Sequence, residues 1–306
     1  MFTNKSILRF FVIVLTLILA GCQTQPCQKT SSSLQRIVSL SPNITEIVYA
    51  LGQQDKLVGV TDFCKYPPQA RKKTHIGGFV NPNIETIVSL KPDILLGLPS
   101  HRDLAQKLRS EHFEFVLLPD DRLNDVFFAI DSLGKLLNCK ARADSLIRSI
   151  KDSLQFYRKC ALKTETFRPL AMLVIGRDPG ATTHLTVVGP HTFIDSVWTL
   201  VGGKNAFADL PAKYAQVNRE NVLLKQPDLI IEFRFGALWN AHKDALNLKS
   251  WQSFASIPAV KNKQIYVLTG NYTLIPGPRI YKLAADYYRI IRAFFAGKRK
   301  SESGNL

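Results

Sequence analysis

The stretch Glu85-Thr-Ile-Val-Ser-Leu-Lys-Pro92-Asp93-Ile-Leu-Leu96 recurs later in the chain as Glu220-Asn-Val-Leu-Leu-Lys-Gln-Pro227-Asp228-Leu-Ile-Ile231. In both copies a glutamate stands seven residues before a Pro-Asp pair, and the two copies are 135 residues apart. A separation of about one domain length indicates two similar units. We therefore expect two related lobes, with the functional site in a cleft between them.

Each copy predicts a short amphipathic helix followed by a buried strand. The helix should end near Pro92 or Pro227, because the residue that precedes a proline avoids the α-helical conformation. The apolar runs from Ile94 to Leu96 and from Leu229 to Ile231 are typical of strands covered on both faces of a parallel sheet. This alternation predicts an α/β fold with two doubly wound lobes.

The same patterns assign the rest of the chain to lobes. A helical repeat at Ala143, Leu146, Ile147, Ile150, Leu154 and Tyr157 predicts one long rigid helix that joins the lobes. After the strand from Arg36 to Leu40, Asn43 or Thr45 should cap a helix that Gly52 ends. The expected parts are a first lobe over residues 34–122, an inter-lobe helical region over 123–166, a second lobe over 167–296 and a disordered tail over 297–306.

The N-terminus predicts export. Lys5 and Arg9 precede an apolar stretch from Phe10 to Leu19, which is short for a membrane-spanning helix and typical of a signal peptide over residues 1–21. The sequence Leu19-Ala-Gly-Cys22 resembles the bacterial lipobox, which implies cleavage before Cys22 and a lipid on its thiol. An uncleaved anchor is the alternative. The polar residues 22–33 should then form a flexible tether.

The composition of the chain limits the kinds of partner that we expect for it. The net charge of +16 is spread along the chain without a basic motif interleaved with aromatic residues, so we expect no nucleic-acid partner. The four cysteines besides Cys22 permit disulfides in an oxidising compartment, but their pairing stays open among three possibilities. They are Cys27, Cys64, Cys139 and Cys160.

Catalytic motifs are not found. The chain has no GxGxxG, Walker A, GxSxG or HExxH pattern, so we expect neither an enzyme nor a resident cofactor. Two other classes stay open. One is a chelatase-like enzyme, and the other is a metal-ion binder that uses histidines such as His75, His101 and His184.

Aromatic residues occur next to predicted strands and helices in both halves of the chain. Phe63 and Phe79 lie in the first half, and Tyr214 and Tyr272 lie in the second. Ligands approach α/β sheets at such loops, and aromatic side chains from two lobes would suit a large flat or macrocyclic ligand.

Five segments of the chain carry a family resemblance. They are Ser39-Leu-Ser-Pro-Asn-Ile-Thr-Glu46, Tyr66-Pro-Pro-Gln-Ala70, Asn83-Ile-Glu-Thr-Ile-Val-Ser-Leu-Lys-Pro-Asp93, Gly202-Gly-Lys-Asn-Ala-Phe207 and Gln216-Val-Asn-Arg-Glu220. These segments resemble the substrate-binding proteins of cobalamin, haem and ferric-siderophore ABC importers. They occur in the family's order, and the resemblance runs from about Arg36 to Phe295. It implies two α/β lobes, a long connecting helix, a ligand in the cleft and limited hinge closure.

The resemblance also implies roles for individual residues. Glu85 and Glu220 match acidic residues that dock onto arginines of the membrane permease, although a first-turn glutamate also complements a helix dipole. Phe63, Phe79 and Tyr214 match aromatic positions of the cobalamin binders, and residues 271–275 match their ligand loop. That loop is Asn271, Tyr272, Thr273, Leu274 and Ile275. This chain departs from the cobalamin binders at several positions. Asn271 and Ile275 stand where those proteins have an acidic and a basic residue, and Leu98 stands where they have a tryptophan. Val201 and Ala293 occupy the positions of their disulfide.

The function expected from the resemblance is capture without chemistry. A monomeric protein, tethered to a bacterial membrane and facing the periplasm or the cell exterior, would bind a corrinoid and present it to an ABC permease. ATP hydrolysis would belong to separate ATPase subunits. Haem or a ferric siderophore is the alternative ligand within the same family.

Overall fold

The computed structural model describes residues 35–108, 113–163, 167–177, 184–234 and 249–303. The predicted signal peptide, the tether, Cys22 and Cys27 lie outside these residues. Gln35 to Leu306 form one unit with two β-sheets, each of which is the centre of one lobe. No helix in the described part of the chain is both long and apolar enough to cross a bilayer.

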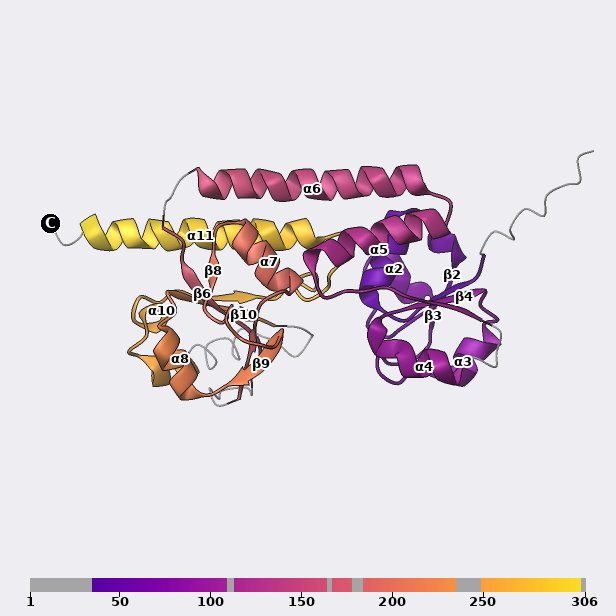
Figure 1. The fold of residues 1–306 in the computed structure, drawn as a ribbon, viewed down its shortest axis with the longest axis horizontal. Coiled ribbons are helices and arrows are strands. Elements are labelled where there is room, and N and C mark those ends of the chain that lie inside the picture. The colour runs from indigo at the N-terminus through magenta and orange to yellow at the C-terminus, as the bar shows by residue number, and fades with distance from the viewer. Residues whose placement is uncertain (1–34, 109–112, 164–166, 178–183, 235–248, 304–306) are drawn as a thin grey trace, which may run out of the picture. The chain divides into compact units, whose positions relative to one another are not determined.

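The first lobe is built on a five-stranded parallel sheet, as the sequence predicts. Its strand order, 3-2-1-4-5, is that of a doubly wound sheet. Helices α2 and α5 cover one face, and α3 and α4 cover the other (Figure 1). The strands are β1 (Ile37–Ser39), β2 (Leu57–Val60), β3 (Thr74–His75), β4 (Ile94–Gly97) and β5 (Glu114–Leu117); the helices are α2 (Pro42–Ala50), α3 (Ile84–Ser89), α4 (Arg102–Lys107) and α5 (Leu123–Leu136).

The second lobe has a mixed sheet of order β11-β10-β6-β7-β9, with β8 paired to β6. β7 runs antiparallel to β6 and β9, which differs from the uniform alternation expected from sequence. Only eight residues separate β6 from β7, too few for the crossover that parallel strands require. The strands are β6 (Leu170–Gly176), β7 (Leu185–Val188), β8 (Lys204–Asn205), β9 (Tyr214–Val217), β10 (Leu229–Phe233) and β11 (Ile265–Leu268).

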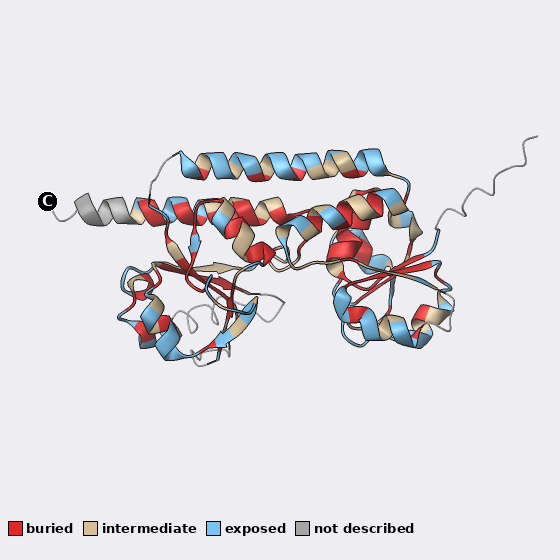
Figure 2. Ribbon diagram, in the orientation of Figure 1, coloured by how far each residue is buried: buried red, intermediate tan, exposed pale blue. Residues whose placement is uncertain are grey.

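Long helices connect the two lobes. The predicted long helix is α6 (Lys140–Leu162), which packs against both α5 and α11. Its buried residues form one stripe, while its opposite face is exposed (Figure 2). That stripe is Ala143, Ile150, Leu154 and Ala161. The remaining helices are α7 (Phe193–Leu200), α8 (Arg219–Lys225), α10 (Pro258–Lys261) and α11 (Ile280–Ser303).

Two helix boundaries differ from the sequence predictions. The N-cap of α2 is Ser41, whereas Thr45 is buried inside the helix with its hydroxyl 2.9 Å from Ser39 Oγ and 3.1 Å from Cys64 Sγ. Pro42 begins the helix because its fixed φ suits the first helical position. At the other end of the chain, α11 continues to Ser303 through residues predicted to be a disordered tail, since lysine, arginine and glutamate favour helix.

Three of the four cysteines besides Cys22 lie in the described part of the chain. Cys64 is a buried free thiol in the first lobe, and Cys139 is a free thiol at the N-cap of α6. Cys160 lies near the other end of the same helix, about 30 Å from Cys139 at 1.5 Å of rise per residue. A bridge between Cys139 and Cys160 is therefore not possible in this fold.

The repeated motif forms the same local structure in both lobes. Asn83 caps α3 by accepting a hydrogen bond from the Thr86 amide, and Asn218 caps α8 in the same way from the Asn221 amide, each at 2.9 Å. The residue before each proline, Lys91 or Gln226, has a φ of 45°. This left-handed residue ends the helix and turns the chain into the following strand.

The aspartate of each Pro-Asp pair then joins two neighbouring strands. Asp93 Oδ2 accepts hydrogen bonds from the amides of Gln35 and Arg36, at 2.8 and 2.9 Å, where the chain enters β1. Asp228 Oδ2 accepts one from the Leu170 amide, at 2.8 Å, at the start of β6. The motif therefore sets the register at which β4 meets β1 and β10 meets β6.

Asp93→Ala should lower the free energy of unfolding by about 1 to 2 kcal/mol, because two amide donors lose a charged acceptor. Asp93→Asn, which keeps an acceptor oxygen, should cost less. Urea unfolding followed by circular dichroism measures both. Equal stability of the alanine variant and the wild type would show that the carboxylate does not tie β4 to β1.

Candidate functional site

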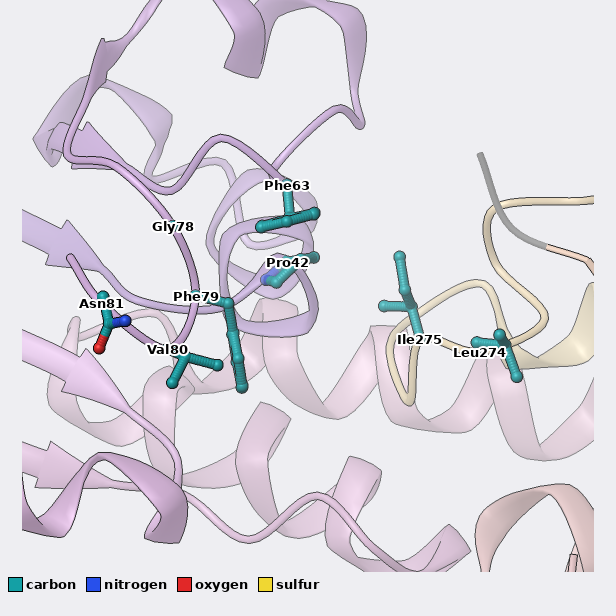
Figure 3. A pocket seen from close by; sticks show the side chains of 8 residues that line it. All are labelled: Pro42, Phe63, Gly78, Phe79, Val80, Asn81, Leu274 and Ile275. Atoms are coloured by element: carbon teal, nitrogen blue, oxygen red, sulfur yellow. The ribbon is translucent and has the colours of Figure 1, made fainter. Parts of the chain in front are cut away.

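An apolar pocket of about 600 Å³ opens at the end of the first sheet and is closed on one side by a loop that follows β11 (Figure 3). The first lobe contributes most of the lining, and Leu274 and Ile275 contribute the opposite side. The residues that line it are Pro42, Phe63, Gly78, Phe79, Val80, Asn81, Leu274 and Ile275. Its size and apolar character are those of a small-molecule site.

The strand order explains why the pocket lies here. β1 leads to Pro42, β2 leads to Phe63, and β4 leads to His101, so these residues come from the carboxyl ends of three parallel strands. The direction of the strand order reverses between β1 and β4, and ligands of doubly wound sheets bind at this switch point.

A buried histidine holds one wall of the pocket. The Leu98 amide donates to His101 Nδ1, so Nε2 carries the proton and donates to the Phe79 carbonyl, each at 3.0 Å. The two rings also meet edge to face, with centroids 4.7 Å apart. Burial lowers the pKa of His101, so the ring is neutral and fixed in this tautomer at neutral pH.

The predicted ligand loop divides into two kinds of residue. Leu274 and Ile275 line the pocket, whereas Asn271 accepts a hydrogen bond from Arg279 and Tyr272 donates one to Asp286. Thr273 is buried and donates to the Gly270 carbonyl at 2.8 Å. The first three residues of the loop therefore support the two that face the pocket.

Tyr214 is not among the residues that line this pocket. It begins β9 and is 38% exposed. Burial raises its pKa to about 12, with Asp121 and Asp120 acting in the same direction. Asp120 is itself partly buried beside Asp121 and Asp125, and its pKa is raised to about 6. Tyr214 thus adjoins an acidic segment, and its role in ligand binding stays a prediction.

Of the eight residues predicted to bind ligand, the structure brings four together in the pocket. These are Phe63, Phe79, Leu274 and Ile275. Sequence reasoning missed the other four lining residues, Pro42, Gly78, Val80 and Asn81. Pro42 closely follows the first predicted strand, and Val80 directly follows Phe79. Their position next to these predicted features was the signal that could have identified them as pocket residues.

Glu85 and Glu220 are both exposed and occupy the second position of α3 and α8. Exposed apolar side chains accompany them: Ile84 precedes Glu85, and Leu224, which is 80% exposed, lies one turn after Glu220. Each lobe therefore presents a carboxylate beside an apolar group at an equivalent helix start.

The histidines considered for a metal ion do not converge. His75 pairs with Asp62 at the surface, whereas His101 uses both ring nitrogens inside the first lobe. Within the described ranges, no group of three or more histidine, cysteine, aspartate or glutamate side chains could hold a metal. The described residues thus offer no support for the metal-ion alternative.

His101→Ala should lower the free energy of unfolding by about 2 kcal/mol at pH 8, because two hydrogen bonds of a buried ring are lost. This difference in the free energy of unfolding between His101→Ala and the wild type should be smaller at pH 5. The wild-type ring resists protonation, so the unfolded chain binds an extra proton below about pH 6.5 and wild-type stability falls there.

Urea titrations between pH 5 and 8 check this, with the exposed His75→Ala as the control. A His101→Ala deficit that does not change with pH would contradict the buried neutral ring.

The chain is similar in sequence to periplasmic binding proteins. The family model described as periplasmic binding protein matches residues 37–272. The vitamin B12-binding protein of Vibrio cholerae is 32% identical over 248 residues, which cover 80% of this chain and 84% of that protein. An uncharacterised ABC transporter substrate-binding lipoprotein of Bacillus subtilis, YvrC, is 28% identical over 255 residues, covering 80% of this chain and 76% of that protein.

Solved structures agree with the fold. The periplasmic vitamin B12-binding protein BtuF of Vibrio cholerae superposes with a TM-score of 0.71 at 28% identity, over 86% of this chain and 98% of that chain. The periplasmic haem-binding protein RhuT of Roseiflexus sp. RS-1 superposes with a TM-score of 0.72 at 24% identity, over 85% and 99%, a likeness of fold alone. The chain belongs to the periplasmic binding protein family and is a substrate-binding protein of the cobalamin, haem and siderophore type.

Proposed function

We propose that this protein captures a corrinoid and delivers it to the permease of an ABC importer. The observation that carries the proposal is the apolar pocket, in which Phe63 and Phe79 face Leu274 and Ile275 (Figure 3). Aromatic and aliphatic side chains on two sides suit the broad faces and edges of a macrocycle. The sequence similarity to a vitamin B12-binding protein supports the same ligand class.

The chemistry of the lining favours a corrinoid over the two alternatives. Haem iron needs an axial histidine, cysteine, methionine or tyrosine, and none of the eight lining residues is of these types. An anionic ferric siderophore would be attracted by lysine or arginine, and the lining residues include neither. A corrinoid brings its own axial groups and needs no ligand from these side chains.

The proposed location is a bacterial membrane, with the protein facing the periplasm or the cell exterior. Residues 1–21 would direct export, and lipid on Cys22 would hold the protein through the tether of residues 22–33. The name of the Bacillus subtilis relative, a lipoprotein, supports this anchor. We propose that the first lobe ends near residue 122, that the second begins near residue 167, and that the helical connection lies between them.

Glu85 and Glu220 are the proposed permease contacts. Both carboxylates are exposed, they stand at equivalent positions of the two lobes, and each can form charge-assisted hydrogen bonds with a basic partner. Two matched contacts on two lobes would orient the protein as well as attract it. The protein would act as a monomer, and ATP hydrolysis would occur on partner subunits.

Calorimetric titration of the full chain in detergent with cyanocobalamin, haem and a ferric siderophore tests the ligand. We expect one-to-one binding of cyanocobalamin. Phe79→Ala should weaken it about tenfold or more, because an aromatic contact and its buried area are lost.

Phe128→Ala is the matched control, because Phe128 is 55% exposed on α5 and is not among the pocket residues. Binding of haem or the siderophore in place of cyanocobalamin would reject the corrinoid and retain the family. Equal effects of Phe79→Ala and Phe128→Ala would place the ligand elsewhere.

Glu85→Lys and Glu220→Lys should each reduce uptake of labelled cobalamin about tenfold in cells that contain the importer, because each reverses one docking charge. The double variant should abolish uptake, while calorimetric affinity for cobalamin stays unchanged. The exposed Glu114→Lys on β5 is the control. Normal uptake by the double variant would remove both glutamates from the docking surface.

A further inference from the structure

Arg279, the residue before α11, makes a buried ion pair with the opposite lobe. Its Nε donates to Glu46 Oε2 at 2.8 Å, and its Nη2 donates to Glu46 Oε1. Glu46 lies in α2 of the first lobe, 233 residues away in sequence. The side chains are only 8% and 2% exposed. The two parallel hydrogen bonds match the planar fork of arginine, which lysine cannot reproduce.

The same guanidinium contacts both loops that supply pocket residues. The Cζ atom of Arg279 lies 3.8 Å from the ring centroid of Tyr66, which belongs to the loop that carries Phe63. Its Nη1 donates to Asn271 Oδ1 at 2.7 Å. Its Cζ lies 5.7 Å from the ring centroid of Tyr272, which belongs to the same loop that ends at Ile275. One side chain thus joins α2, the loop after β2 and the loop after β11.

The backbone beside Arg279 approaches the first lobe closely as well. A Cβ atom built on Gly277 would lie 3.4 Å from Glu46 Oε2 and 3.7 Å from the Cα of Asn43. The loop of the second lobe therefore rests against the first turns of α2, directly beside the pocket residue Pro42. Tyr272 also donates to Asp286 of α11 at 2.6 Å, so the loop is held to its own lobe on the other side.

General energetics give this ion pair a role in geometry more than in stability. Burial raises the pKa of Glu46 despite the hydrogen bond and charge of Arg279, so desolvation is the larger effect. Buried pairs of this kind often contribute little net stability compared with apolar residues of the same volume. What they do supply is geometry, because the carboxylate and the guanidinium are satisfied in only one arrangement.

We infer that Arg279 is a positioning residue that sets the spacing between the Phe63 side and the Ile275 side of the pocket before ligand arrives. This inference rests on the proposed function for its ligand and on the ligand-free contacts for its mechanism. A pocket held at the correct width avoids the cost of ordering two loops during binding. Cobalamin should then leave more slowly than from a protein whose loops are loose.

Hydrogen–deuterium exchange of the ligand-free full chain in detergent tests the mechanism without any ligand. Arg279→Gln should speed amide exchange at least fivefold in residues 61–66 and 270–275, while exchange in β1, β4, β6 and β10 stays unchanged. Arg279→Lys should give an intermediate result. Arg292→Gln is the matched control, since Arg292 is an exposed arginine on the same helix.

Surface plasmon resonance with cyanocobalamin then measures the consequence. Arg279→Gln should raise the dissociation rate about tenfold and change the association rate little. The neutral pair Glu46→Gln with Arg279→Gln leaves no buried unpaired charge, so it keeps the test valid where the single variant folds poorly. It should show the same loose loops and fast dissociation.

The outcomes separate the two proposals. Failure of the wild type to bind cyanocobalamin rejects the corrinoid, and the exchange experiment still decides the role of Arg279. Exchange in the two loops that matches the wild type in both Arg279→Gln and the neutral pair overturns the positioning role. Loose loops with unchanged dissociation overturn its link to affinity.

Discussion

A buried charge needs a partner at a defined distance, and in this protein the partner belongs to the other lobe. Glu46 and Arg279 are each almost inaccessible to water, so separating them would leave a carboxylate and a guanidinium unsatisfied. The contact forces the second-lobe loop to stay against α2. The pocket lies next to this contact, with Leu274 and Ile275 opposite Phe63 and Phe79.

The helices provide the rigid frame around this contact. α6 packs on α5 and α11, and α5 also contacts α7, so helices of both lobes form one continuous set of contacts. A further link joins the lobes where the Phe193 amide donates to the Asp121 carbonyl at 2.7 Å. Large relative motion of the two lobes would break these contacts together.

Several functional predictions from sequence depended on local chemistry and could be made without coordinates. The Pro-Asp repeat indicated helix ends and buried strands because proline restricts its neighbour wherever it occurs. Phe63 was found because it follows a predicted strand, and Phe79 because it precedes a predicted helix. By contrast, Thr45 was misread as a cap because its hydroxyl contacts Ser39 and Cys64, partners that only the folded first lobe brings near.

The sequence by itself determined the α/β class, the long connecting helix, the duplicated glutamates and half of the predicted pocket residues, since these follow from periodicity and from residues close in the chain. Tertiary structure alone decided the mixed second sheet, the support of Phe79 by His101 and the joining of two loops by Arg279. These features depend on contacts between residues up to 233 positions apart. Local propensity carries no information about such pairs, because their free energy appears only when both lobes have folded and the groups have left water.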